Sequence, residues 1–107
     1  MIKRIWVLAS LGVLLASGSA LAGDPVAGQA KSKTCAACHG TDGNSATPDF
    51  PRLAGQYADY LVKVMKDYKS GARKNAIMAP QAANLSVGDI EDLAAFYSRQ
   101  RGLAQKY

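Results

Sequence analysis

Apolar side chains recur along most of the chain at the three- and four-residue intervals that are typical of helices, and no segment alternates with a period of two. The clearest repeat lies in the middle of the chain and consists of Tyr57, Tyr60, Leu61, Val64 and Tyr68. Gly71 follows this repeat and is placed to end the helix. The pattern therefore predicts an all-α domain.

The signals for helix starts predict a first helix and the loop that follows it. Asp24 is placed as an N-cap, with Pro25 at the first helical position. The helix is expected to run through Ala30 toward Cys35. Residues 40–50 are rich in Gly, Asn, Asp, Ser, Thr and Pro, which predicts a loop.

A last helix is predicted near the end of the chain. Ser86 is placed as its N-cap, with Asp89 in the reciprocal position of a capping box. The acidic side chains of its first turn suit the positive end of the helix dipole. Its apolar stripe consists of Ile90, Leu93, Ala94 and Tyr97.

The beginning of the chain has the features of a secretory signal. After two basic residues, residues 5–16 are almost wholly apolar, and small residues follow up to an A-x-A pattern that ends at Ala22. The apolar run is shorter than the roughly 20 residues that a spanning helix needs. We expect a signal peptide over residues 1–22, cleaved after Ala22, with an uncleaved anchor as the alternative. The remaining domain, residues 23–107, is then exported to the periplasm.

A domain of this size buries little apolar surface and usually needs a disulfide, a metal or a cofactor to be stable. Both cysteines of the chain, Cys35 and Cys38, lie in the segment CAACH, directly before its one histidine, His39. A disulfide between them would close a very small loop and constrain the unfolded chain little. A thioredoxin-like redox motif would need a βαβ context, and a zinc site would need four ligands.

Covalent haem attachment accounts for the two cysteines and the histidine together. Residues three apart on a helix face the same way, so the sulfurs of Cys35 and Cys38 are placed to bond the two vinyl groups of one porphyrin. His39 then directs its imidazole at the iron. The sequence predicts one haem c, bound through both cysteines, with His39 as an iron ligand.

The net charge argues against a nucleic-acid partner. The formal charge is +5 for the whole chain, and basic and acidic side chains are interspersed. Removal of the leader would leave about +3, and two haem propionates would reduce this to about +1.

A second iron ligand is expected from another part of the chain, and two methionines of the predicted domain are candidates. Met65 falls inside the amphipathic middle helix, where a role in the core is the simpler interpretation. Met78 lies in a segment that we expect to be a loop, just before Pro80, and a loop turns a thioether toward iron more readily. We therefore favour Met78. A His/Met pair is typical of electron-transfer cytochromes c, and the thioether raises the reduction potential.

The chain resembles the class I cytochromes c, most closely the short bacterial cytochromes of the c4, c5 and c553 kind. The resemblance covers essentially all of the predicted domain. It is carried by CAACHG with the preceding AGQA, by PRLAGQYADYL, by GARKNAIM and by LSVGDIEDLAAFY. It implies a cytochrome c fold, with three to four helices wrapped around one haem and the first and last helices crossing near Gly28 and Tyr97. It also implies that the carbonyl of Pro51 accepts a hydrogen bond from Nδ1 of His39.

Three polar side chains are candidates for contacts around the haem. Arg52 and Arg73 are placed to neutralise the propionates, although solvent exposure is the common position of arginine. Tyr68 offers its hydroxyl to the Met78 sulfur or to a propionate, with buried packing as the alternative.

These features predict a one-electron carrier and not an enzyme. Its partners would be redox proteins, with transient association with membrane-bound respiratory complexes, and an apolar rim of Ala36, Ala37, Ile77 and Ala79 would contribute to docking. One alternative is the haem-bearing subunit of a larger dehydrogenase. Another is a haem peroxidase or gas-binding protein, which usually needs distal acid–base residues.

Overall fold

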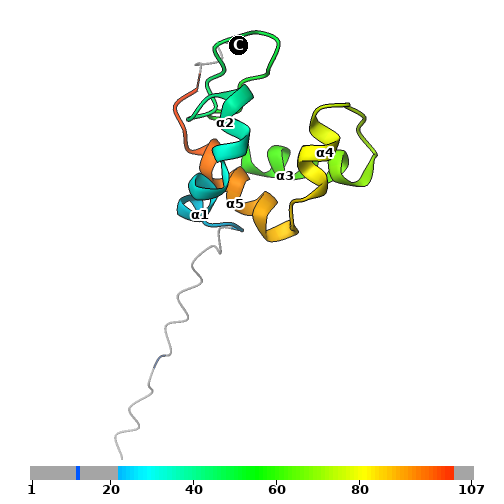
Figure 1. The fold of residues 1–107 in the computed structure, drawn as a ribbon. Helices are drawn as coiled ribbons and strands as arrows, with labels where there is room; N and C mark the ends of the chain where they lie inside the picture. The colour runs from blue at the N-terminus through cyan, green and yellow to red at the C-terminus, as the bar shows by residue number, and fades with distance from the viewer. Residues whose placement is uncertain (1–11, 13–21, 103–107) are drawn as a thin grey trace, which may run out of the picture.

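Five helices form the described part of the chain. The computed structural model describes residue 12 and residues 22–102. The helices are α1 (Pro25–Lys31), α2 (Lys33–His39), α3 (Ala58–Ser70), α4 (Met78–Ala83) and α5 (Val87–Ser98) (Figure 1). These residues contain no strand, which confirms the all-α prediction. Within the same residues, no helix has the length and apolar character needed to cross a membrane.

The predicted leader lies outside the described residues, except for Gly12 and Ala22. Its role and its cleavage therefore stay a prediction.

Local sequence signals set most of the helix ends. The Asp24 side chain accepts a hydrogen bond from the Val26 amide, with Pro25 at the start of α1. Gly71 ends α3 in the left-handed conformation at φ 86° and ψ 2°. Glycine has no Cβ, so it adopts this conformation with little steric strain. At the start of α5, the side chains of Ser86 and Asp89 form the predicted capping box.

The predicted first helix is in fact two helices, α1 and α2, that meet at Ser32. The Ser32 hydroxyl donates to the Gln29 carbonyl at 2.7 Å, and the Ser32 amide donates to the same oxygen at 3.2 Å. Such local bonds compete with the regular helical ladder. As a result, Cys35 and Cys38 lie on α2, a separate helix of seven residues.

The loop predicted around Met78 is also wrong, because Met78 is the first residue of the short helix α4. Pro80 lies in the first turn of this helix, where its missing N–H would have had no partner. A proline at this position is therefore compatible with a helix start as well as with a loop.

α1 and α5 come from opposite ends of the described chain and cross in close contact (Figure 1). A Cβ placed on Gly28 would lie 1.9 Å from the Asp92 carbonyl oxygen, so only glycine allows this approach. Lys31 of α1 pairs with Asp89 at 2.8 Å and with Asp92 at 2.6 Å. The crossing that the resemblance implied is thus present at Gly28.

The core lies between α3 and α5, and the long loop between α2 and α3 is tied to it. The core cluster consists of Leu61, Leu93, Ala94, Phe96 and Tyr97. The loop contacts the end of α5 through a hydrogen bond from the Gly55 amide to the Tyr97 carbonyl at 3.0 Å, and it contacts the segment after α5 through one from Asn44 Nδ2 to the Arg101 carbonyl at 2.8 Å. These contacts position the loop that follows His39.

Candidate functional site

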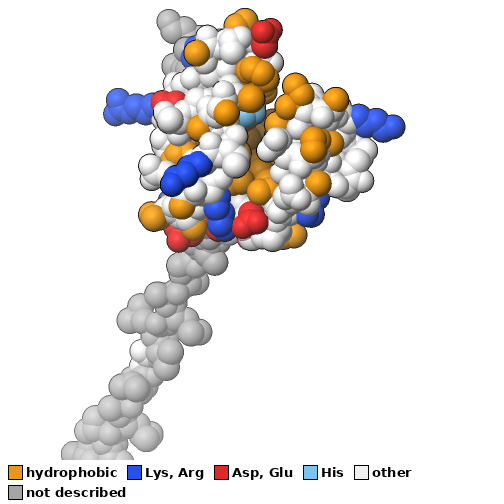
Figure 2. Space-filling model, in the orientation of Figure 1, with side chains coloured by type: hydrophobic (Ala, Val, Ile, Leu, Met, Phe, Trp, Pro, Cys, Tyr) orange, Lys and Arg blue, Asp and Glu red, His pale blue; other side chains and the backbone are white. Residues whose placement is uncertain are grey.

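A hollow lined by apolar side chains opens between α2 on one side and α3 and α4 on the other, and the one histidine is visible inside it (Figure 2). The hollow consists of an outer cavity of about 160 Å³ and an inner cavity of about 210 Å³. Both cavities are lined by Cys35, His39, Pro51, Tyr68 and Met78. We call the two cavities together the crevice.

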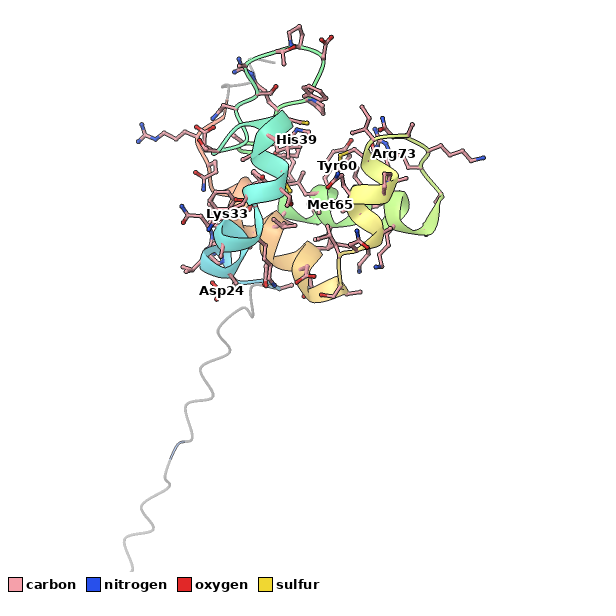
Figure 3. The ribbon with its side chains drawn as sticks, in the orientation of Figure 1. Asp24, Lys33, His39, Tyr60, Met65 and Arg73 are labelled. Atoms are coloured by element: carbon pink, nitrogen blue, oxygen red, sulfur yellow. The ribbon has the colours of Figure 1, made fainter. Side chains whose placement is uncertain are left out.

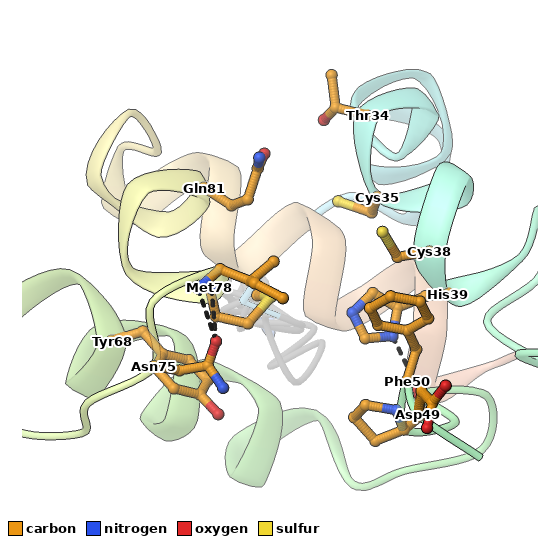
Figure 4. Close-up of a pocket in the computed structure, with 12 residues that line it drawn as sticks. Thr34, Cys35, Cys38, His39, Asp49, Phe50, Tyr68, Asn75, Met78 and Gln81 are labelled. Atoms are coloured by element: carbon orange, nitrogen blue, oxygen red, sulfur yellow. Dashed lines mark hydrogen bonds between the residues drawn. The ribbon is translucent and has the colours of Figure 1, made fainter. Parts of the chain in front are cut away.

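The wall formed by α2 carries the predicted attachment motif. Cys35 and Cys38 are free thiols, and both are half-buried. They lie one helical turn apart on α2 and face the same side, as Figure 4 shows. The two sulfurs are therefore placed to form two bonds to one ligand in the crevice. The adjacent His39 points into the same space.

The His39 imidazole is oriented by the loop that follows it. His39 is 6% exposed, and its Nδ1 lies 2.8 Å from the Pro51 carbonyl oxygen (Figure 4). A carbonyl only accepts hydrogen bonds, so Nδ1 is the donor and carries the proton of the neutral ring. Nε2 is then left with its lone pair, as a metal ligand requires. The hydrogen bond that the resemblance implied is present.

The Phe50 ring adds a second constraint on this imidazole. It meets the His39 ring edge to face, with a centroid distance of 6.4 Å. The ring is thus held by a hydrogen bond at one nitrogen and by an aromatic neighbour.

The opposite wall presents Met78. Its backbone amide donates to Asn75 Oδ1 at 2.9 Å, and the Ile77 amide donates to the same oxygen at 2.9 Å. The Asn75 side chain therefore satisfies two amides at the start of α4 and holds the backbone of Met78 in place. In Figure 4, Met78 lies across the crevice from His39 and the two cysteines.

Met65, the other candidate ligand, has a different environment. It lies on α3 and packs against the core cluster. It lines the inner cavity, whereas Met78 lines both cavities. This position agrees with the core role expected for Met65.

Arg52 and Arg73 both line the inner cavity, and both are exposed. The Arg73 guanidinium lies 5.3 Å from the centroid of the Tyr68 ring, an arrangement that favours a cation–π contact. The Tyr60 hydroxyl is the main cause of a raised pKa at Arg73, followed by Tyr68. Tyr60 and Arg73 lie on the same side of the crevice in Figure 3. Among the described residues, no aspartate or glutamate lines this cavity, so the arginines are the charged groups that face it.

Sequence reasoning did not assign a role to Asn75. The spacing was the available signal, because an asparagine that lies two or three residues before an amide is placed to accept from it. Asparagines are common in loops for several reasons, so the spacing alone does not distinguish this one.

The residues of the crevice fit a covalently bound haem. Two half-buried thiols lie on one turn, an imidazole has its Nε2 free, and a thioether faces it from the other wall. Apolar side chains dominate both cavities, and the arginines provide cationic partners for carboxylates.

Comparison with known proteins supports this fit. Residues 25–98 match the family model of cytochrome c. The chain is 51% identical over 80 residues to cytochrome c4 of Pseudomonas aeruginosa, which covers 75% of this chain and 40% of that protein. It is also 51% identical over 82 residues to cytochrome c-554(548) of Halomonas halodenitrificans, which covers 74% of this chain and 99% of that protein.

A solved structure shows the same fold. The crystal structure of reduced recombinant cytochrome c4 from Pseudomonas stutzeri superimposes with a TM-score of 0.72 at 46% identity, over 76% of this chain and 47% of that one. The chain thus spans less than half of the length of these cytochromes c4. The chain belongs to the cytochrome c family, as a class I c-type cytochrome with one haem c attached through Cys35 and Cys38.

Proposed function

We propose that the protein carries single electrons between redox partners, and that His39 and Met78 would be the two protein ligands of the haem iron. The bound haem supplies a one-electron Fe(III)/Fe(II) couple. The observation that carries the proposal is the placement of His39 and Met78 on opposite walls of one apolar crevice. Two protein ligands leave no iron position for a substrate, which favours a carrier over an enzyme.

His39 is suited to a constant ligand role because its surroundings fix both the rotation and the tautomer of its ring. The Pro51 carbonyl holds the proton on Nδ1, and the Phe50 ring restrains the imidazole plane. A ring held in this way needs little rearrangement when the charge of the iron changes. The hydrogen bond at Nδ1 also makes Nε2 a stronger electron-pair donor to iron.

Met78 closes the other face and raises the reduction potential, because a thioether favours the lower charge of Fe(II). Asn75 keeps the start of α4 in place, so the backbone of Met78 would hold the same position in both oxidation states. Enzymatic haem sites usually contain a distal acid–base group. Among the described residues that line the crevice, His39 is the one imidazole, and Asp49 of the outer cavity is the one carboxylate.

Arg52 and Arg73 are proposed to bind the haem propionates at the inner cavity. Their exposure leaves the charges accessible to solvent, so each pair would contribute modestly to stability. Tyr60 and Tyr68 contact the Arg73 guanidinium and restrain it near the cavity.

Electrons would leave through the crevice opening, which the outer cavity defines. Ile77 lines this cavity and is 55% exposed, and Ala37 is exposed on α2. A small apolar rim of this kind favours weak, short-lived contacts with redox proteins. Export to the periplasm, as the leader predicts, would place the carrier beside such partners, including membrane-bound respiratory complexes.

The near-infrared charge-transfer band from methionine sulfur to Fe(III) tests the ligand pair directly. We expect this band in the oxidised wild type and in Met65→Leu, and we expect its loss in Met78→Ala. A wild-type protein without the band, with high-spin features in its place, would contradict six-coordinate ligation. If Met65→Leu lost the band and Met78→Ala kept it, the ligand would instead be Met65.

A further inference from the structure

Tyr97 carries a buried hydroxyl that the proposed function does not use. The residue lies on α5, is 2% exposed and lines the inner cavity together with Cys35. Within the described part of the chain, its hydroxyl oxygen has no hydrogen-bond partner. A buried hydroxyl without a partner is destabilising, so a native protein usually provides one.

Cys35 packs against the core cluster that contains Tyr97, and Cys35 and Ser32 are both near enough to affect the pKa of Tyr97. Ser32 already donates its hydrogen to the Gln29 carbonyl at 2.7 Å, so it has only its oxygen lone pairs to offer. Burial, followed by the neighbouring Cys35, raises the pKa of Tyr97 above its ordinary value of 10.0. The phenol is therefore neutral at physiological pH and has one hydrogen to donate.

Haem attachment changes what Cys35 offers to this hydroxyl. A free thiol carries its own hydrogen, which competes with the phenol for the role of donor. In the thioether, the sulfur bears two carbon substituents and no hydrogen, so it is an acceptor only. The covalent bond to haem thus removes the competing hydrogen and leaves the Cys35 sulfur as an acceptor only for the Tyr97 hydroxyl.

We propose that Tyr97 Oη donates a hydrogen bond to the Cys35 thioether sulfur and is a positioning residue that raises the haem reduction potential. The proposal rests on haem attachment through Cys35 and is independent of the sixth iron ligand. The O–H dipole directs its positive end toward the sulfur and the attached porphyrin. That orientation favours the reduced state, which carries one positive charge less.

The native protein tests the hydrogen bond without any mutation. We would record the carbon–sulfur stretching bands of the thioethers by resonance Raman spectroscopy in H2O and after complete exchange into D2O. Deuteration of the Tyr97 hydroxyl is expected to shift one of these bands. No shift in any thioether band would overturn the proposal.

Tyr97→Phe tests the effect on the potential and separates the proposal from a purely structural role. We expect a lower reduction potential, a lower melting temperature and loss of the deuterium shift. If the hydroxyl has no partner in the holoprotein, its removal will instead raise the melting temperature and leave the potential unchanged. That result would contradict the hydrogen bond.

Two control variants identify the acceptor. Tyr57→Phe removes the same atom from a side chain that is 78% exposed, and it should leave the potential and the band unchanged. Ser32→Ala removes the competing acceptor and should retain the deuterium shift, even where loss of the bond to Gln29 alters the junction of α1 and α2. A Ser32→Ala variant that reproduces the changes of Tyr97→Phe would assign the hydrogen bond to Ser32 and overturn the proposal.

Discussion

The position of Met78 depends on one side-chain oxygen. Asn75 Oδ1 accepts from the amides of Ile77 and Met78, both at 2.9 Å, at a helix start that has no other side-chain cap. Capping oxygens of this kind stabilise a helix by about 1 kcal/mol. Since α4 is only six residues long, the cap is a large part of what defines the Met78 backbone.

Removal of this cap is expected to loosen the Met78 ligand. Asn75→Ala should lower the free energy of unfolding by roughly 0.5–2 kcal/mol and weaken the near-infrared methionine band. Asn75→Asp keeps an acceptor oxygen at the same position and should retain both properties. Thermal unfolding and near-infrared absorption check the pair, and equal values for wild type and Asn75→Ala would contradict the role of the cap.

The residues of the site differ in how far they can be predicted from the sequence. Cys35, Cys38 and His39 are predictable because haem attachment requires them within one helical turn. The preference for Met78 over Met65 rests on an expected loop that is in fact the start of α4, and ligation by Met78 stays a prediction. The Asn75 cap uses a local spacing that many loop asparagines share, and the unpaired Tyr97 hydroxyl depends on contacts between residues far apart in the sequence.

At the scale of helices, the contact between α1 and α5 depends on the absence of one side chain. A Cβ at Gly28 would meet the Asp92 backbone at 1.9 Å and the Phe96 Cβ at 2.9 Å. Neither neighbour moves without shifting α5, which carries most of the buried core.

Gly28→Ala is therefore expected to destabilise the protein by about 1–3 kcal/mol, as overpacking in a close contact does. Gly88→Ala is the matched control, because its Cβ would lie 3.7 Å from Ser86 Oγ, an ordinary contact. The control lies in the first turn of α5, so it should gain at most about 0.5 kcal/mol from the higher helix propensity of alanine. Chemical denaturation of both variants checks the difference, and equal stabilities would argue against the tight crossing.

The long amphipathic helices were predictable, and the short ones were not. α3 and α5 contain enough turns for a repeat of apolar residues to be visible, and both have defined ends at Gly71 and Ser86. The break at Ser32 and the start of α4 depend on single side-chain hydrogen bonds, made by Ser32 and Asn75. A periodicity of apolar residues does not report such bonds.

At the scale of the whole molecule, an ion-pair cluster joins the two ends of the described chain. Lys31 of α1 contacts Asp89 and Asp92 of α5, and the Asp24 amide donates to Asp92 Oδ1 at 2.8 Å. Hydrogen bonding to Lys31, followed by bonds from the Ser86 backbone and side chain, lowers the pKa of Asp89 from 3.8 to about 2.

This lowered pKa predicts a pH-dependent stability. A carboxyl whose folded pKa lies below its unfolded value stabilises the fold fully above the unfolded value. The stability is then lost as the pH falls from 3.8 to about 2. Asp89→Asn should therefore be less stable than wild type near neutral pH, and the difference should disappear across that acid range.

Glu91→Gln, which removes a carboxylate of α5 with no ion pair among the described residues, is the control. Melting temperatures against pH check this, and a constant difference would contradict the cluster.

Electron exchange at the crevice opening involves the whole molecule as well. Ile77→Glu places a charge on the proposed rim, and two such molecules should repel each other when they meet there. We expect the electron self-exchange rate, measured by NMR in mixtures of both redox states, to fall several-fold at low salt and to recover at high salt. Val87→Glu alters an equally exposed side chain, 51% against 55%, that lines neither cavity. An equal loss of rate in both variants would argue against docking at the rim.

The crossing of α1 and α5 has a consequence for the order of events during biosynthesis. The hydrogen bond between Asp24 and Asp92 joins residues 68 positions apart, so the two helices meet only after nearly the whole domain has emerged. The cysteine motif directly follows α1 and emerges long before α5. Closure of such a long loop is slow compared with local helix formation. We therefore expect Cys35 and Cys38 to be accessible to the attachment reaction before α5 packs on α1.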